Sequence, residues 1–207
     1  MKKEENLGLL VTLKAKKGKE QNVKDFLLGG LEIVNNEAET VSWFAYQIDA
    51  QTFGIYDTFT NEEGRNSHLN GDVAKALMAN ANELLEEFDA SKSIQKAEIL
   101  ALDLKKGNQD IGLLVNLKAK EGKDEEVEAF LKLGQTIVHA KEPKTVSWYA
   151  LKLGNGNYAI FDTSHDEEGR LAHLNGEVAA ALMEKAPEII EGFSIDAIKK
   201  IDVIASK

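Results

Sequence analysis

The sequence of 207 residues contains no cysteine and only two prolines. The absence of cysteine excludes disulfides, iron–sulfur clusters, cysteine zinc sites, thiolate-bound haem and catalytic thiols. Long apolar runs are missing as well. The mostly apolar run Leu7–Leu13, which follows the polar residues Met1–Asn6, is too short for a signal or membrane segment. We therefore expect a cytoplasmic protein.

Positive charge is in short supply. Lys and Arg number 25 against 35 Asp and Glu, for a net charge of −10, which repels phosphate backbones and anionic lipid surfaces. We therefore expect that the protein binds neither nucleic acid nor a membrane. Hydrophobic residues make up 43% of the chain, enough for a buried core, so disordered and fibrous classes are excluded. No G-x-G-x-x-G or phosphate-binding loop occurs, so a tightly held nucleotide is not expected.

The chain repeats itself after about half its length. Residues 6–27 align with residues 110–131 without a gap, and 13 of 22 positions are identical. Residues 40–85 align with residues 145–190, where 23 of 46 are identical after a one-residue insertion near Pro143. This predicts a duplicated domain, with residues 1–105 as the first copy and residues 106–207 as the second.

Hydrophobic periodicity predicts the same order of elements in each copy. In the first copy, residues 7–15 form a strand and residues 20–35 an amphipathic helix, followed by a hairpin over residues 40–48 and 53–59. A helix then begins near Asn61, breaks at Asn70-Gly71 and continues from Asp72 to about Phe88, and residues 93–104 form a last strand. We expect Asn-Gly to end the helix through a left-handed residue, and Pro187 to mark a helix restart in the second copy.

The order βαββαβ is that of a ferredoxin-like domain. Its strands are apolar on both faces, with Trp43 and Ala45 on one side and Phe44 and Tyr46 on the other. The helices cover one face, and the second copy is the simplest cover for the other. We predict an α+β fold in which two tandem ferredoxin-like βαββαβ repeats pack sheet to sheet as an intramolecular pseudo-dimeric α+β barrel. Whether this assembles further as a homo-oligomer is open.

One segment occurs in both copies and carries a family resemblance. It reads EEGRNSHLNGDVAKAL from Glu62 and EEGRLAHLNGEVAAAL from Glu167. Preceded by Thr40-Val41-Ser42-Trp43, it resembles the antibiotic biosynthesis monooxygenase domain family of the dimeric α+β barrel superfamily, in its quinol monooxygenase branch. The resemblance implies a small apolar pocket between sheet and helices in each copy, and oxygen insertion into an aromatic or quinol-like molecule with O2 and without metal, flavin or other cofactor.

The resemblance and the residue types nominate site residues. A quinol must lose a proton before it passes an electron to O2, so a base and anion-holding donors are needed. His68 and His173 are the candidate bases, because histidine titrates near neutral pH. The candidate substrate-binding residues are Trp43, Tyr46, Arg65, Asn70, Trp148, Arg170 and Asn175.

Each candidate also has a structural interpretation. The histidines could instead bond a backbone carbonyl, the tryptophans could simply pack in the core, and the arginines could form solvated ion pairs on the helix surface. For Asp57 and Asp162 the favoured interpretation is that each caps a helix or stabilises a turn. His139 and His165 have no counterpart in the other copy and are predicted to be surface residues.

Metal and haem sites are not expected. The four histidines show no ligand spacing. In the haem-degrading branch the ligand histidine falls further along the helix, where this chain has Met78 and Met183. Two functions remain open: a cofactor-independent monooxygenase, or a non-catalytic, stress-associated protein that binds a small hydrophobic molecule. The copies differ at Tyr46/Leu151 and Phe59/Ser164, so one copy alone could be functional, and the more aromatic first copy is favoured.

Overall fold

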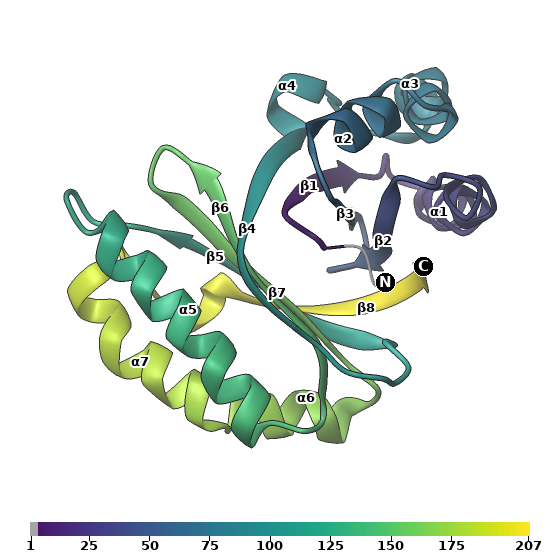
Figure 1. The fold of residues 1–207 in the computed structure, drawn as a ribbon. Coiled ribbons are helices and arrows are strands. Elements are labelled where there is room, and N and C mark those ends of the chain that lie inside the picture. The colour runs from purple at the N-terminus through teal and green to yellow at the C-terminus, as the bar shows by residue number, and fades with distance from the viewer. Residues whose placement is uncertain (1–3) are drawn as a thin grey trace. The chain divides into compact units, whose positions relative to one another are not determined.

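The computed structural model describes residues 4–207 (Figure 1). Residues 1–3, with which the predicted first domain begins, lie outside the described residues. The first half contains β1 (Leu7–Lys14), α1 (Glu20–Val34), β2 (Thr40–Gln47), β3 (Thr52–Phe59), α2 (Glu62–Leu69), α3 (Asp72–Leu84), α4 (Ala90–Ser93) and β4 (Ile94–Leu104). The second half contains β5 (Ile111–Lys118), α5 (Asp124–Lys141), β6 (Thr145–Gly154), β7 (Asn157–Ser164), α6 (Glu167–Leu174), α7 (Glu177–Ile189), η1 (Ile195–Ala197) and β8 (Ile198–Ser206).

The predicted α+β class and the βαββαβ order are confirmed in each half. β3 pairs antiparallel with β1 and with β2, and β7 pairs in the same way with β5 and β6. Both halves carry a bulge at the same place, between Thr40 and Ser42 in β2 and between Thr145 and Ser147 in β6. The hydrogen-bonded strand order is that of a closed barrel, β1-β3-β2-β8-β5-β7-β6-β4.

The chain divides into two compact units that exchange the ends of their last strands. Unit 1 comprises the described residues up to Ala97 together with Asp202–Lys207, and unit 2 comprises Glu98–Ile201. Within unit 2, the end of β4 pairs with β6, and within unit 1 the end of β8 pairs with β2. The sequence boundary after residue 105 divides the repeats and stays a prediction.

Each unit has one hydrophobic core between its sheet and its long helices. In unit 2, α5 and α7 lie side by side over the strands, and their apolar stripes meet Trp148, Ala150 and Ile160 (Figure 1). In unit 1, α1 and α3 pack in the same way on Trp43, Ala45 and Ile55. Burying these large side chains is the main stabilising contribution to each unit.

Three local predictions are corrected by the structure. α3 ends at Leu84 rather than Phe88, because Leu85 turns extended and bridges to Ala15 beside β1. Pro187 marks no helix restart, since it lies inside the last turns of α7. Asn70 and Gly71 do not adopt left-handed backbone, with φ of −106° and −79°.

The hairpin of the second half has a tight two-residue turn. Asn155 and Gly156, which join β6 to β7, have φ of 53° and 73°. Positive φ at both central residues is typical of the type I′ hairpin turn, whose twist matches that of its strands. Among residues 4–207, no helix has the length and apolar character needed to cross a membrane.

Candidate functional site

In unit 2, a buried histidine lies between two carboxylates. His173 is on α6, which begins at the N-cap Asp166. Its Nε2 lies 3.3 Å from Asp162 Oδ2 on β7, and its Nδ1 bonds Glu142 Oε2 just beyond α5. Thr145 Oγ1 lies 3.3 Å from the same Nδ1. Both ring nitrogens of His173 therefore face an acidic oxygen.

Unit 1 repeats this arrangement. His68 on α2 has Nε2 at 3.2 Å from Asp57 Oδ2 and Nδ1 at 2.6 Å from Glu37 Oε2. Thr40 Oγ1 lies 3.3 Å from Nδ1, and the α2 N-cap Asn61 accepts a hydrogen bond from the Gly64 amide. We call each set of Asp, His and Glu a carboxylate–histidine triad.

The carboxylates control the charge of both histidines. Burial by itself lowers the pKa of the His68 imidazole, but Asp57 and Glu37 outweigh it and raise that pKa to about 10. His173 is shifted in the same way, with its pKa raised to about 10 by Asp162 and Glu142 against the effect of burial. At neutral pH both rings are imidazolium cations that donate two N–H groups.

A tryptophan lies next to the aspartate of each triad. Trp148 on β6 pairs across the sheet with Asp162 on β7, and Trp43 pairs with Asp57 in the same register. Directly paired residues of antiparallel strands place their side chains next to each other on one face. The indole Nε1 of both tryptophans is buried without a hydrogen-bond partner among the described residues, as is Oδ1 of both aspartates.

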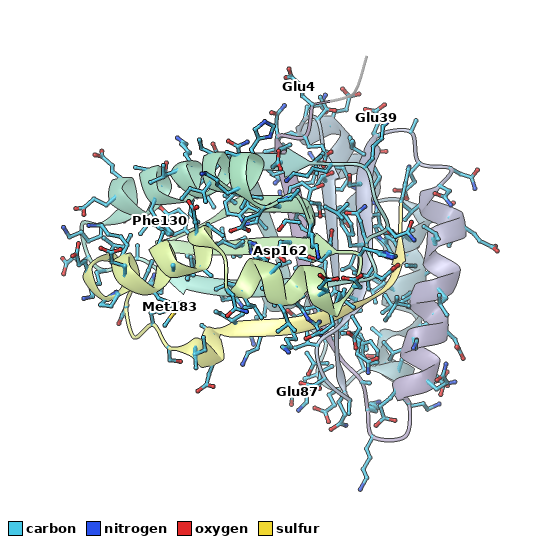
Figure 2. All side chains as sticks on the ribbon, turned by 90° about the horizontal axis from the view of Figure 1, so that it is seen from below. Glu4, Glu39, Glu87, Phe130, Asp162 and Met183 are labelled. Carbon is cyan, nitrogen blue, oxygen red and sulfur yellow. The ribbon has the colours of Figure 1, made fainter. Side chains whose placement is uncertain are left out.

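In unit 2 these groups line a small cavity of about 30 Å³. Its walls are otherwise apolar and come from the sheet and from α5, α6 and α7. Figure 2 labels Asp162 toward one end of this helical layer, and Phe130 of α5 and Met183 of α7 toward the other. The cavity is lined by Leu113, Val115, Phe130, Leu131, Gly134, Trp148, Ile160, Asp162, His173, Leu174, Val178, Ala179, Leu182 and Ile198.

All of these lining residues recur unchanged at the aligned positions of the first copy, although about half of the aligned residues differ overall. By contrast, three buried residues of the same core differ between the copies: Tyr158, Ile189 and Ile190. None of the three lines the cavity. The lining of the cavity is therefore fully shared by the two copies, as are 13 of the 16 buried residues of this core.

The histidines also border a groove on the outer surface. In unit 1 this groove measures about 690 Å³ and is lined by Glu37, Thr40 and His68 among others. In unit 2 it measures about 370 Å³ and includes Glu142 and His173. Each triad thus lies between the interior of its unit and the solvent.

The arginines proposed as anion holders have a different position. Arg65 is buried and donates to the carbonyls of Gly8 and Ala97, and it pairs with Glu62. Arg170 donates to the Ile201 carbonyl and pairs with Glu167. They are ion-paired with the preceding acidic residues, as the structural interpretation held, but they are buried against strands rather than solvated.

The other predicted residues also lie away from the tryptophans. Asn70 Nδ2 donates to the Asn66 carbonyl and Asn175 Nδ2 to the Leu171 carbonyl, so both side chains bond the last turn of their helix. Tyr46 lies on the opposite face of the sheet from Trp43, against Gly54. The structure does not bring these residues together with the histidines and tryptophans.

The remaining histidines and the methionines are at the surface. His139 and His165 are exposed and pair with Asp103 and Asp110, which confirms their predicted place. Met78 and Met183 are about half exposed on the outer side of their helices. Within residues 4–207, no three His, Asp or Glu side chains form a group suited to a metal ion.

Sequence reasoning missed the acidic partners of both triads. Asp57 and Asp162 neither cap a helix nor form a turn, because they lie within β3 and β7 with their side chains buried. A charged residue at an inward position of an apolar strand was the available signal. Glu37 and Glu142 were not considered, although each is an acid that follows the first long helix of its copy.

A glycine makes room for each of these glutamates. A Cβ on Gly176 would overlap Glu142 Oε1, whereas a Cβ on Gly71 would lie 3.1 Å from Glu37 Oε1. Their φ values of −82° and −79° suit any residue, so the glycines serve close approach rather than turning. In unit 2 this close approach allows the Val178 amide, at the start of α7, to donate a hydrogen bond to Glu142 Oε1.

We expect Gly176→Ala to lower the pKa of His173 clearly below about 10, because the added methyl pushes the Glu142 carboxylate off the ring. Gly71→Ala is the matched control and has a smaller effect on His68. The measurement is an imidazole ¹⁵N NMR titration of both variants. Equal shifts in the two copies would contradict the steric explanation.

Comparison with solved structures places this fold among known proteins. A putative monooxygenase from Fusobacterium nucleatum is 15% identical with a TM-score of 0.81, covering 98% of this chain and 94% of that chain. A putative monooxygenase from Lactobacillus acidophilus NCFM is 12% identical with a TM-score of 0.80, covering 98% and 96%.

A third structure, from Listeria monocytogenes, is a ferredoxin-fold protein described as related to antibiotic biosynthesis monooxygenases. It is 12% identical with a TM-score of 0.54, covering 96% of this chain and 95% of that chain. No protein-family model and no curated protein matches the sequence. The chain has the ferredoxin-like α+β fold of proteins related to antibiotic biosynthesis monooxygenases.

Proposed function

We propose that this chain is a cofactor-independent monooxygenase acting on a small phenol- or quinol-like aromatic molecule with O2. One observation carries the proposal: Trp148 and Asp162, which are paired across the sheet, both line a mostly apolar cavity, and the indole N–H and the carboxylate Oδ1 have no hydrogen-bond partner among the described residues. Buried polar groups left without partners are costly, and a ligand hydroxyl satisfies both, since it accepts from the indole and donates to the carboxylate.

The identical lining of the two copies supports a ligand site in each. The unsatisfied pair recurs as Trp43 with Asp57 and as Trp148 with Asp162. Phe59 lies 5.4 Å from His68, measured between ring centroids, and Ser164 replaces it in the second copy. We expect the copies to share a ligand class and to differ in rate.

The chemistry needs no electron source besides the substrate. Removal of the hydroxyl proton makes the ring electron-rich enough to give one electron to O2. The two radicals join as a carbon-bound peroxide, which takes up a proton and loses water to leave a carbonyl. The four electrons that reduce O2 come from the substrate, and one oxygen atom ends in the product and one in water. The protein's part is to hold the anion with preorganised donors, and the Trp148 indole is such a donor.

The cavity must widen when a ring enters. At about 30 Å³ it is well below the ~150 Å³ of an engineered cavity that binds benzene. Phe130 and Leu182 are on the helices that form its outer wall. Side-chain movement between α5 and α7 is therefore part of substrate entry.

The test is oxygen uptake by metal-stripped protein with a panel of hydroquinones and polyphenols. Trp43→Phe/Trp148→Phe keeps an aromatic ring at each position and removes both N–H donors, so we expect the turnover rate to fall about 100-fold, the cost of losing one donor to a developing anion. His139→Gln/His165→Gln, at exposed positions, is the matched control. With ¹⁸O2, one labelled atom should appear in the product.

The second candidate function is a protein that binds a small hydrophobic molecule without converting it. Calorimetric measurement of the binding of the same compounds distinguishes it from the monooxygenase. The triads favour a non-catalytic binding protein, because both imidazole nitrogens of His173 already contact carboxylates and neither is free to act as a base. Binding that depends on the tryptophan N–H groups without oxygen uptake would show a non-catalytic binding protein. Neither uptake nor binding would contradict both functions.

A further inference from the structure

We propose that Asp57 and Asp162 are the proton acceptors of this site, and that His68 and His173 remain cationic and hold the charge of these aspartates. The inference rests on the proposed function. It assigns the base to the residues that sequence reasoning gave a capping or turn role, and it changes the role expected of the histidines.

The histidines have no nitrogen free for a substrate. In unit 2 the His173 Nδ1 is bonded to Glu142 and the Nε2 faces Asp162 at 3.3 Å. In unit 1 the corresponding contacts of His68 are 2.6 Å to Glu37 and 3.2 Å to Asp57. A histidine acting as base needs an unprotonated nitrogen within hydrogen-bond reach of the substrate proton. Here both nitrogens are directed at acceptors and so carry hydrogens.

Each aspartate, unlike the histidines, has an acceptor atom without a hydrogen-bond partner in the described chain. Oδ1 of Asp162 is buried, accepts no hydrogen bond within the described chain, and belongs to a residue that lines the cavity. Its neighbour across the sheet is Trp148, whose indole N–H is also unused. Because Trp148 and Asp162 are directly paired, we infer that a hydroxyl held by that N–H reaches the Asp162 carboxylate. Asp57 and Trp43 repeat the pairing in unit 1.

The proton balance is simple. The substrate O–H bond breaks, its proton forms a bond with Asp Oδ1, and the electron pair stays on the substrate oxygen. The negative charge moves from the carboxylate to the substrate beside an imidazolium that was already there, so the total charge in the cavity is unchanged. The same aspartate can return the proton to the peroxide formed later. Glu37 and Glu142 are positioning residues that keep the rings protonated.

The test compares pH profiles of oxygen uptake. Asp57→Asn/Asp162→Asn should lower turnover at least 100-fold at every pH, within the range typical of general bases. Glu37→Gln/Glu142→Gln should lower turnover at neutral pH and move the alkaline limb of the profile to lower pH, because the imidazolium loses its proton earlier. A rise in uptake at neutral pH in the glutamine variant would overturn the inference, since it would mean that a freed neutral histidine is the base.

A second measurement does not depend on turnover. In ¹⁵N spectra of the wild type at pH 8, both buried histidines should show two protonated ring nitrogens, and the Asp→Asn or Glu→Gln variants should show neutral rings at lower pH than the wild type. Neutral imidazole in the wild type at pH 8 would overturn the inference. If no panel compound supports uptake, the proposed monooxygenase fails, and these spectra alone decide the charge assignment.

Discussion

The free energy of unfolding should fall by several kcal/mol as the pH rises from 6.5 to 10. The pKa values of His68 and His173 are raised from 6.5 to about 10 in the folded chain. A raised pKa stabilises the fold fully below the unfolded value, and this stabilisation is lost as the pH rises through the folded value. Each unit of pKa shift corresponds to about 1.4 kcal/mol, so two histidines shifted in this direction make the loss several kcal/mol.

Two carboxylates contact each ring, and both raise its pKa. His68 faces Asp57 from β3 and Glu37 from the loop after α1, and the ammonium of Lys207, which follows β8, donates to the Glu37 carbonyl. His173 faces Asp162 from β7 and Glu142 from the end of α5. The raised pKa values of the lysines and tyrosines start from 10.5 and 10.0, at or above the top of this pH range.

Urea unfolding at intervals from pH 6 to pH 10, followed by circular dichroism, measures the effect. The double variant His68→Gln/His173→Gln removes the titrating groups, so its stability should change little over the same range. A wild-type stability that stays flat between pH 7 and pH 10 would show that the rings are neutral in the fold.

Most of the fold could be predicted because it depends on signals local in sequence. The helical stripe of residues 20–34, the β-branched run from Thr40 and the Asn155-Gly156 turn each specify an element with little help from elsewhere. Errors occurred where tertiary contacts compete. Strand-like bridging of Leu85 to Ala15 shortened α3, and helix packing accommodated Pro187 inside α7.

The site was harder to predict because its partners are far apart in the chain. His173 meets Glu142 across 31 residues, and neither spacing nor residue type links them. The tryptophans and histidines were candidates by residue type and resemblance, and in unit 2 Trp148 and His173 do line one cavity. The charge of His68 and His173 could not be predicted from the sequence. A histidine is partly protonated in water near neutral pH, and it stays protonated in the folded chain because two buried carboxylates contact it.

That surrounding makes His173 a large stability determinant. Replacing it with Leu leaves Asp162 and Glu142, which are 0% and 7% exposed, without their counter-charge. Breaking a buried ion pair by removing one partner costs about 3–5 kcal/mol. We expect His173→Leu to lose this much unfolding free energy at pH 7, and His165→Leu, at an exposed position, to lose almost none.

The two copies provide an internal scale for this effect. His68→Leu should cost less than His173→Leu, because the side chain of Glu37 is 20% exposed and retains part of its hydration. Replacing all three members of the second triad, as Glu142→Gln/Asp162→Leu/His173→Leu, should recover much of the loss, since no unpaired charge then remains buried. Urea unfolding of the three variants at pH 7 gives the order. A triple variant less stable than His173→Leu would show that the loss comes from packing around the imidazole and not from the uncompensated carboxylates.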